Sequence, residues 1–193
     1  MIKELLHLIM RFFSKTDAES QDRQLTLPVS PDVFNERVLT PALRLLPEKM
    51  DTPEARVMLV TIALQESALA HRWQVVDRSQ PEHMGPARGL LQFERGGGVY
   101  GVLNHVSSRK YAHQVCAARG IEPSVNAVYE ALHKDDILAA AFGRLLLWTD
   151  PQALPTLGDS KAAWDLYMRC WRPGKPWPDK WPDNYKEAMK WVS

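Results

Sequence analysis

The pattern of hydrophobic and polar positions predicts a chain built mostly from helices. Near the N-terminus, apolar side chains recur at helical spacing, as in an amphipathic helix: Ile2, Leu5, Leu6, Ile9 and Phe13. A polar stretch without periodicity follows as far as residue 27 and indicates a linker. We therefore divide the chain into an N-terminal helix and linker, residues 1–27, and a domain over residues 28–193.

Start signals place the first helices of the domain. Ser30 and Thr52 each stand directly before a proline, which favours a helix start with the polar residue as its N-cap. Pro41 and Pro47 limit how far the first of these helices can run. The second is apolar nearly all round, so we expect it to be the central and most enclosed helix.

Between residues 72 and 104, glycines and prolines interrupt every longer pattern and predict a loop or small hairpin region, with Gly96 to Gly98 as a flexible loop. Helical patterns then return over residues 107–120, 122–134, 135–149 and 160–171, and Ser160 is the expected cap of the last. The proline- and tryptophan-rich residues 172–185 cannot be helical until their end. The expected fold is α+β and mostly helical, with a small hairpin or loop lobe.

Composition narrows the classes of partner. With 193 residues, of which 45% are hydrophobic, the chain is long enough for one sizeable core. The 24 basic residues nearly balance the 23 acidic ones, so we do not expect nucleic acid as a partner. Cys116 and Cys170 are too few for a disulfide scaffold, and whether they pair stays open. His113 and Cys116 lie one turn apart without a second pair at ligand spacing, so we expect no metal and no cofactor.

The N-terminal stretch "MIKELLHLIMRFFSK" is not expected to cross a membrane. Its apolar run is far shorter than the roughly 20 residues that a bilayer requires, it is interrupted by Glu4 and His7, and no small-residue cleavage site follows. We expect this helix to pack on the domain or on a sister chain. Weak contact with a membrane surface and a vestigial export signal are the alternatives.

A carboxylate in the second helix is the first candidate for chemistry. Ile62 and Leu59 stand one and two turns before Glu66, which therefore shares a stripe with side chains that leave water. Burial disfavours the charged form of a carboxyl group and raises its pKa. The alternative is a partly exposed glutamate paired with Arg72 or Arg88.

A glutamate that keeps its proton near neutral pH suits the cleavage of glycosidic bonds. That reaction uses a protonated acid beside the leaving oxygen, and inverting enzymes place a second carboxylate roughly 6.5–9.5 Å away to activate water. Candidates for the second carboxylate lie in the expected lobe at Asp77, Glu82 and Glu94.

Glu66-Ser67 on a buried helix, followed by "GLLQFE" at residues 89–94, resembles the goose-type lysozymes and the related lytic transglycosylases, whose signature is Glu-Ser followed by Gly-Leu-Met-Gln. The resemblance implies a lysozyme-like fold in which Glu66 is the catalytic acid, while Asp77 and Glu94 position or activate water. It also implies cleavage of the β-1,4 bond between N-acetylmuramic acid and N-acetylglucosamine. Leu91 stands where methionine is usual, and the interval before Gln92 is longer than in typical transglycosylases.

The resemblance also suggests residues that contact the sugar. The family's Ala-Tyr-Asn-Ala-Gly segment is not intact here, and "AWDLYMRCWRPG" holds the corresponding region, so Tyr167 is the expected partner of the catalytic acid. The expected substrate-binding residues are Gln92, Tyr100, Tyr167 and Trp171. Trp171, Trp177 and Trp181 serve either to stack on sugar rings or to brace a proline-rich loop.

The expected function is a peptidoglycan-cleaving glycosidase, and the expected partner is the peptidoglycan glycan strand. The acids at Asp77 and Glu94 favour hydrolysis, whereas a transglycosylase would leave 1,6-anhydro ends. A phage or prophage lytic protein fits best, made in the bacterial cytoplasm without a clear signal peptide and acting at the cell wall or carried in a virion. The alternatives are a non-catalytic phage structural or glycan-binding protein of the same fold, and an enzyme of the chitinase or chitosanase type.

Overall fold

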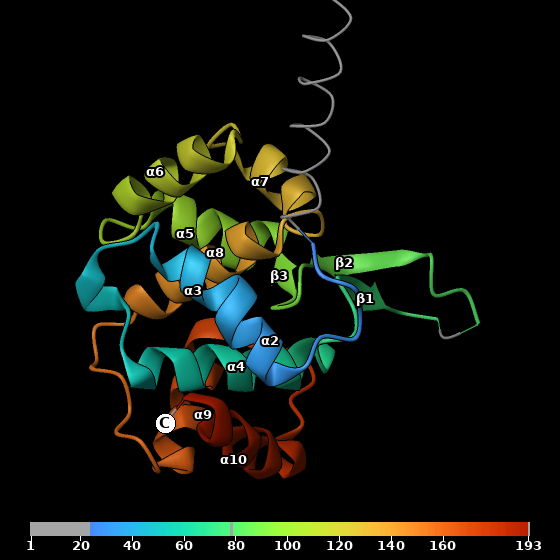
Figure 1. The fold of residues 1–193 in the computed structure, drawn as a ribbon. Coiled ribbons are helices and arrows are strands. Elements are labelled where there is room, and N and C mark those ends of the chain that lie inside the picture. The colour runs from blue at the N-terminus through green and yellow to red at the C-terminus, as the bar shows by residue number, and fades with distance from the viewer. Residues whose placement is uncertain (1–23, 78, 193) are drawn as a thin grey trace, which may run out of the picture.

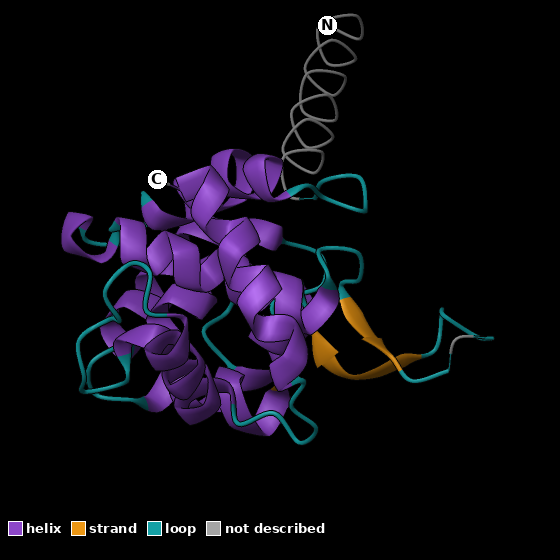
Figure 2. Ribbon diagram, turned by 90° about the horizontal axis from the view of Figure 1, so that it is seen from below, coloured by secondary structure: helices purple, strands orange, loops and turns teal. Residues whose placement is uncertain are grey.

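The computed structural model describes residues 24–77 and 79–192, and the expected amphipathic helix at the N-terminus lies outside them. The described part is mostly helical with one small antiparallel sheet, which confirms the expected α+β class. Figures 1 and 2 show the helices gathered into one body and the sheet at its side. The chain already contacts this body before residue 28, where the domain was predicted to begin. The backbone N–H of Leu25 donates to the Asp136 carboxylate over 3.2 Å.

The first helical run of the domain continues past Pro41. It consists of α2 (Pro31–Phe34), the π-helical η1 (Asn35–Leu39) and α3 (Thr40–Leu43). In the π-helical part the Thr40 N–H reaches back to the Asn35 carbonyl, so the widened turn accommodates a proline that has no N–H of its own. After the 3₁₀ turn η2 (Glu48–Met50), α4 (Pro53–Ser67) begins as predicted, and the Thr52 side chain accepts from the Ala55 N–H.

The sheet follows directly after α4. Strands β1 (Trp73–Val75), β2 (Met84–Arg88) and β3 (Phe93–Glu94) pair antiparallel in this order. The expected flexible loop at Gly96 to Gly98 is instead helical, as η3 (Arg95–Val99) and α5 (Tyr100–Asn104). Val99, Val102 and Leu103, which follow the glycines, all belong to the core. The burial of these side chains outweighs the low helix propensity of the glycines.

Four of the remaining elements match predicted helical patterns: α6 (Arg109–Arg119), α7 (Val125–Ala131), α8 (Asp136–Trp148) and α9 (Ser160–Trp171). The proline-rich segment becomes helical earlier than predicted, with η4 (Pro178–Lys180) and α10 (Trp181–Val192), because a proline is tolerated in the first turn of a helix. Gly120 ends α6 in the left-handed conformation, as its position predicted. Asp159, not Ser160, caps α9, because the Asp159 carboxylate accepts from the Ala162 N–H over 2.9 Å.

The most enclosed helix is α8 rather than α4. All side chains from Asp136 to Leu147 are buried, whereas α4 has several half-buried residues near its C-terminal end. Gly143 of α8 lets another segment come close, since a Cβ atom there would lie 2.5 Å from Leu91 Cδ1. The turn that carries Leu91 thus packs directly on α8, while α10 packs along α4 (Figure 1).

Candidate active site

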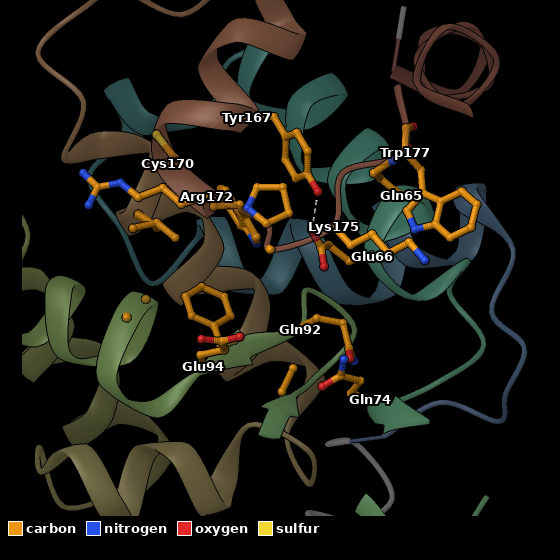
Figure 3. Close-up of a pocket in the computed structure, with 18 of the residues that line it drawn as sticks. Gln65, Glu66, Gln74, Gln92, Glu94, Tyr167, Cys170, Arg172, Lys175 and Trp177 are labelled. Atoms are coloured by element: carbon orange, nitrogen blue, oxygen red, sulfur yellow. Dashed lines mark hydrogen bonds between the residues drawn. The ribbon is translucent and has the colours of Figure 1, made fainter. Parts of the chain in front are cut away.

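A cleft of about 660 Å³ lies where the end of α4, the sheet and the end of α9 meet. Its walls come from parts of the chain that are far apart in sequence, and Figure 3 shows their side chains converging around Glu66. The lining includes Gln65, Glu66, Gln74, Gln92, Glu94, Tyr167, Trp171, Arg172, Lys175 and Trp177. A cleft with a few polar groups and a perturbed carboxyl is the usual setting of a glycan or small-molecule site.

Glu66 is held at the end of α4 by an abrupt change in backbone direction. Ala68 and Leu69 both adopt positive φ angles, 51° and 54°, which are uncommon for residues with side chains and end the helix just beyond Glu66. The Ser67 hydroxyl lies 2.7 Å from the Leu90 carbonyl oxygen, to which it donates, and it accepts from the Leu69 N–H. Ser67 therefore ties the end of α4 to the segment that contains Leu90.

That segment, "GLLQ", forms the tight turn between β2 and β3. Gly89 has a φ of +74°, and a Cβ atom there would lie 2.9 Å from the Leu132 carbonyl oxygen, so the turn requires glycine for two reasons. Gln92 also has a positive φ of 52°, and its side-chain amide donates to the Gly89 carbonyl over 2.8 Å. This conformation places Gln92 on the cleft wall while Leu90 and Leu91 point into the core.

Glu66 is half-buried, and its protonation is tuned by three neighbouring features. Burial raises the pKa of Glu66 from an ordinary value near 4.5 to about 7, a hydrogen bond from Tyr167 opposes the rise, and the charge of Glu94 adds to it. The Tyr167 hydroxyl donates to Glu66 Oε1 over 2.6 Å (Figure 3). At neutral pH, a large fraction of the molecules therefore carries a protonated Glu66.

The alternative pairing of Glu66 with an arginine is wrong. Arg72 instead forms a buried ion pair with Asp136, with Nη2 2.6 Å from Oδ2. Arg88 donates to backbone carbonyls of its own strand and lies over the Tyr129 ring. Both guanidinium groups are thus engaged elsewhere.

Helix α9 brings Tyr167 to Glu66 through aromatic packing. The Tyr167 ring stacks on Trp181 with centroids 4.9 Å apart and contacts Trp164 at 5.3 Å. Trp171, one turn further along α9, donates from Nε1 to the Leu91 carbonyl over 2.9 Å. This indole bond docks α9 on the Gly89–Gln92 turn and fixes the position of the tyrosine hydroxyl.

The structure brings together most, but not all, of the predicted site residues. Glu66, Gln92, Glu94, Tyr167 and Trp171 all line the cleft. The other two, Asp77 and Tyr100, do not line it.

The two predicted residues outside the cleft have other surroundings. Asp77 lies in the loop between β1 and β2, where its carboxylate accepts from the Ser79 N–H and hydroxyl. Those bonds lower the pKa of Asp77. Glu82 is an exposed residue of the same loop. Tyr100 opens α5 with 57% of its surface exposed.

The sequence did not predict that several other residues line the cleft. These are Gln65, Gln74, Arg172, Lys175 and Trp177. Trp177 was noted in the sequence only as one of three tryptophans with an open role. No spacing signal links residues 172–177 to residues 65–66, and only the packing of α10 against both α4 and α9 brings them together.

Cys116 and Cys170 are both free thiols, the first buried in α6 and the second on the cleft wall. Within residues 24–77 and 79–192, no group of three or more His, Cys, Asp or Glu side chains has the arrangement of a metal site.

A scan against models of protein families, a search of curated proteins and a search of solved structures each find no match to this chain. Among the helices of the described residues, none has the length and hydrophobicity needed to span a bilayer.

Proposed function

We propose that the protein is a glycosidase that cleaves peptidoglycan, with Glu66 as the general acid and a lysozyme-like fold. The observation that carries the proposal is a half-buried carboxyl on the wall of a 660 Å³ cleft, with a pKa raised to about 7. Such a group holds a proton near neutral pH and faces a cleft in which a substrate could receive that proton.

In the proposed reaction, Glu66 protonates the oxygen of the glycosidic bond as the bond from that oxygen to the anomeric carbon breaks. Tyr167 donates to Oε1, while Oε2 has no hydrogen-bond partner among the described residues. Oε2 therefore carries the proton towards the substrate, and Tyr167 keeps the carboxyl group in one orientation. The positive charge that develops on the sugar is then quenched by a nucleophile.

Glu94 is the residue proposed to activate water for the hydrolytic route. It lines the same cleft from β3 and is close enough for its charge to raise the pKa of Glu66. As a general base it would accept a proton from the attacking water while the water oxygen bonds to the anomeric carbon.

A lytic transglycosylase is the second candidate, and the position of Asp77 favours it. Asp77 and Glu94 were the two acids expected to position or activate water. Of these two, Glu94 lines the cleft and Asp77 does not. In this route the bond to the leaving oxygen breaks as Glu66 protonates that oxygen, the 6-hydroxyl of the sugar bonds to its own anomeric carbon and gives its proton to the Glu66 carboxylate, and the product carries a 1,6-anhydro end. Mass spectrometry of the released fragments separates the two routes, because hydrolysis adds the mass of one water.

The decisive experiment compares the clearing of bacterial cell walls by the wild-type chain and by Glu66→Gln. We expect the variant to lose at least about a hundredfold in rate, since a general acid contributes that much or more. Glu122→Gln, which neutralises an exposed carboxylate outside the cleft, is the matched control and should clear at the wild-type rate.

Equal clearing by the wild type and Glu66→Gln would refute the role of Glu66, and no clearing by either would favour a non-catalytic protein. Cleavage of neutral chitin oligomers in place of cell walls would favour an enzyme of the chitinase type.

A further inference from the structure

The segment from Arg172 to Lys180 leaves α9 and runs beside the cleft, and we refer to it as the strap. Arg172 ends α9 in the left-handed conformation with a φ of 48°, and three prolines at positions 173, 176 and 178 restrict the backbone that follows. The Gln65 amide donates to the Trp177 carbonyl over 2.9 Å, and its oxygen accepts from Asn184 over 2.9 Å. The residue next to Glu66 therefore anchors the strap to both α4 and α10.

The strap presents two lysines around one exposed indole. Lys175 Nζ lies 5.4 Å from the centre of the Trp177 ring and Lys180 Nζ lies 5.3 Å from it. Trp177 is 54% exposed, so the ring does not serve mainly to fill the core. Its electron-rich face attracts both ammonium groups and offsets part of their mutual repulsion. Trp177 thus holds a positive cluster on the rim of the cleft.

Neither lysine is neutralised by the protein. Among the described residues, Lys175 and Lys180 form no ion pair, although Asp179 lies between them in the sequence. Figure 3 shows the Lys175 side chain extending from the strap towards Trp177, while the Arg172 side chain extends in the opposite direction. Because Lys175 and Trp177 line the same cleft as Glu66, the positive cluster lies at the edge of the proposed substrate cleft.

We infer that Lys175 and Lys180, held on Trp177, bind a carboxylate on the side branch of the muramic acid, so that the site selects an anionic glycan strand over a neutral one. The inference rests on the proposed function. Strands with stem peptides carry several carboxylates, and strands without them still carry the lactyl carboxylate. Chitin lacks both, so the same cluster would discriminate against it.

The test measures binding without cleavage, using the full chain with Glu66→Gln and purified cell-wall sacculi in a pelleting assay. Into this background we introduce Lys175→Met with Lys180→Met. The matched control is Lys110→Met with Lys134→Met, which removes two exposed charges outside the cleft. A third variant, with Lys175→Arg and Lys180→Arg, keeps the positive charge on the strap.

On untreated sacculi at low salt, we expect the strap double variant to bind about tenfold more weakly and the other two to bind like the background. Raising the salt concentration should shrink this difference, because exposed charges are screened. On sacculi whose carboxylates have been converted to methylamides, the difference should disappear. On sacculi stripped of peptides by an amidase, a retained difference assigns the contact to the lactyl carboxylate, and a lost one assigns it to the peptide.

Equal binding of the strap double variant and the background to untreated sacculi would overturn the inference. So would a difference that persists on the methylamide sacculi, because it would not depend on carboxylates. Failure of the wild type to clear walls would instead count against the catalytic role of Glu66, which the binding assay does not measure.

Discussion

Replacement of Glu66 by glutamine should make the protein more stable at alkaline pH. Glutamine is close in shape to a protonated glutamate, and its carbonyl oxygen can still accept from Tyr167, whereas it never acquires the buried negative charge. The pKa of Glu66 lies near 4.5 when the chain is unfolded and at about 7 in the folded cleft. Since each pH unit of such a difference is worth about 1.4 kcal/mol, it corresponds to about 3 kcal/mol.

The direction of the effect follows from where the proton is held. Between pH 4.5 and 7 the folded protein keeps a proton on Glu66 that the unfolded chain has released, so the free energy of unfolding falls as the pH rises. The contribution is fully present below pH 4.5 and has been lost above about pH 7. The two proteins should thus be similarly stable near pH 4.5, and Glu66→Gln should be about 3 kcal/mol more stable at pH 8.

Urea unfolding followed by tryptophan fluorescence, at intervals between pH 4.5 and 8.5, measures this difference directly. Glu122→Gln is again the control, because Glu122 is exposed and away from the cleft. A difference between Glu66→Gln and the wild type that stays constant over this range would refute the reasoning, since it would mean that Glu66 has the same pKa in both states.

Three further predictions concern the neighbours of Glu66. Cell-wall clearing by Glu94→Gln should be slower by at least about a hundredfold if the reaction is hydrolytic, whereas Asp77→Asn should clear at the wild-type rate; the reverse result would contradict the roles assigned here. Tyr167→Phe removes a bond that lowers the pKa of Glu66, so the loss of activity at alkaline pH should move to higher pH, which a rate profile between pH 6 and 9 tests. Ser67→Ala should lower the free energy of unfolding by about 1–3 kcal/mol, because a buried carbonyl loses its donor, and an unchanged urea midpoint would contradict that assignment.

The local patterns predicted the helices well, because caps, prolines and apolar spacing act over a few residues. Thr52 caps α4 and Gly120 ends α6 as expected. The errors occur where distant packing outweighs a local preference. Gly96 to Gly98 lie in a helical turn because the side chains that follow are buried, and a π-helical turn accommodates Pro41.

The candidate site was predictable to the extent that it depends on short motifs. Glu66 could be selected because its helix is apolar around it, and Gln92 and Glu94 because "GLLQFE" resembles a known signature. Asp77 could not be judged from the sequence, because the distance of a loop residue from a cleft depends on where a hairpin projects. Tyr100 was misplaced for a related reason, since the position of α5 decides which way its first side chain faces.

The sequence alone determined which carboxyl group enters the interior, because the 3.6-residue period fixes the face of α4 on which Glu66 lies. Only the tertiary structure decided how that carboxyl group behaves. Its raised pKa arises from burial beside α9, from the Tyr167 hydroxyl 101 positions along the chain and from Glu94 across the cleft. Desolvation and charge interactions depend on distances in space, which the order of residues along a chain does not give.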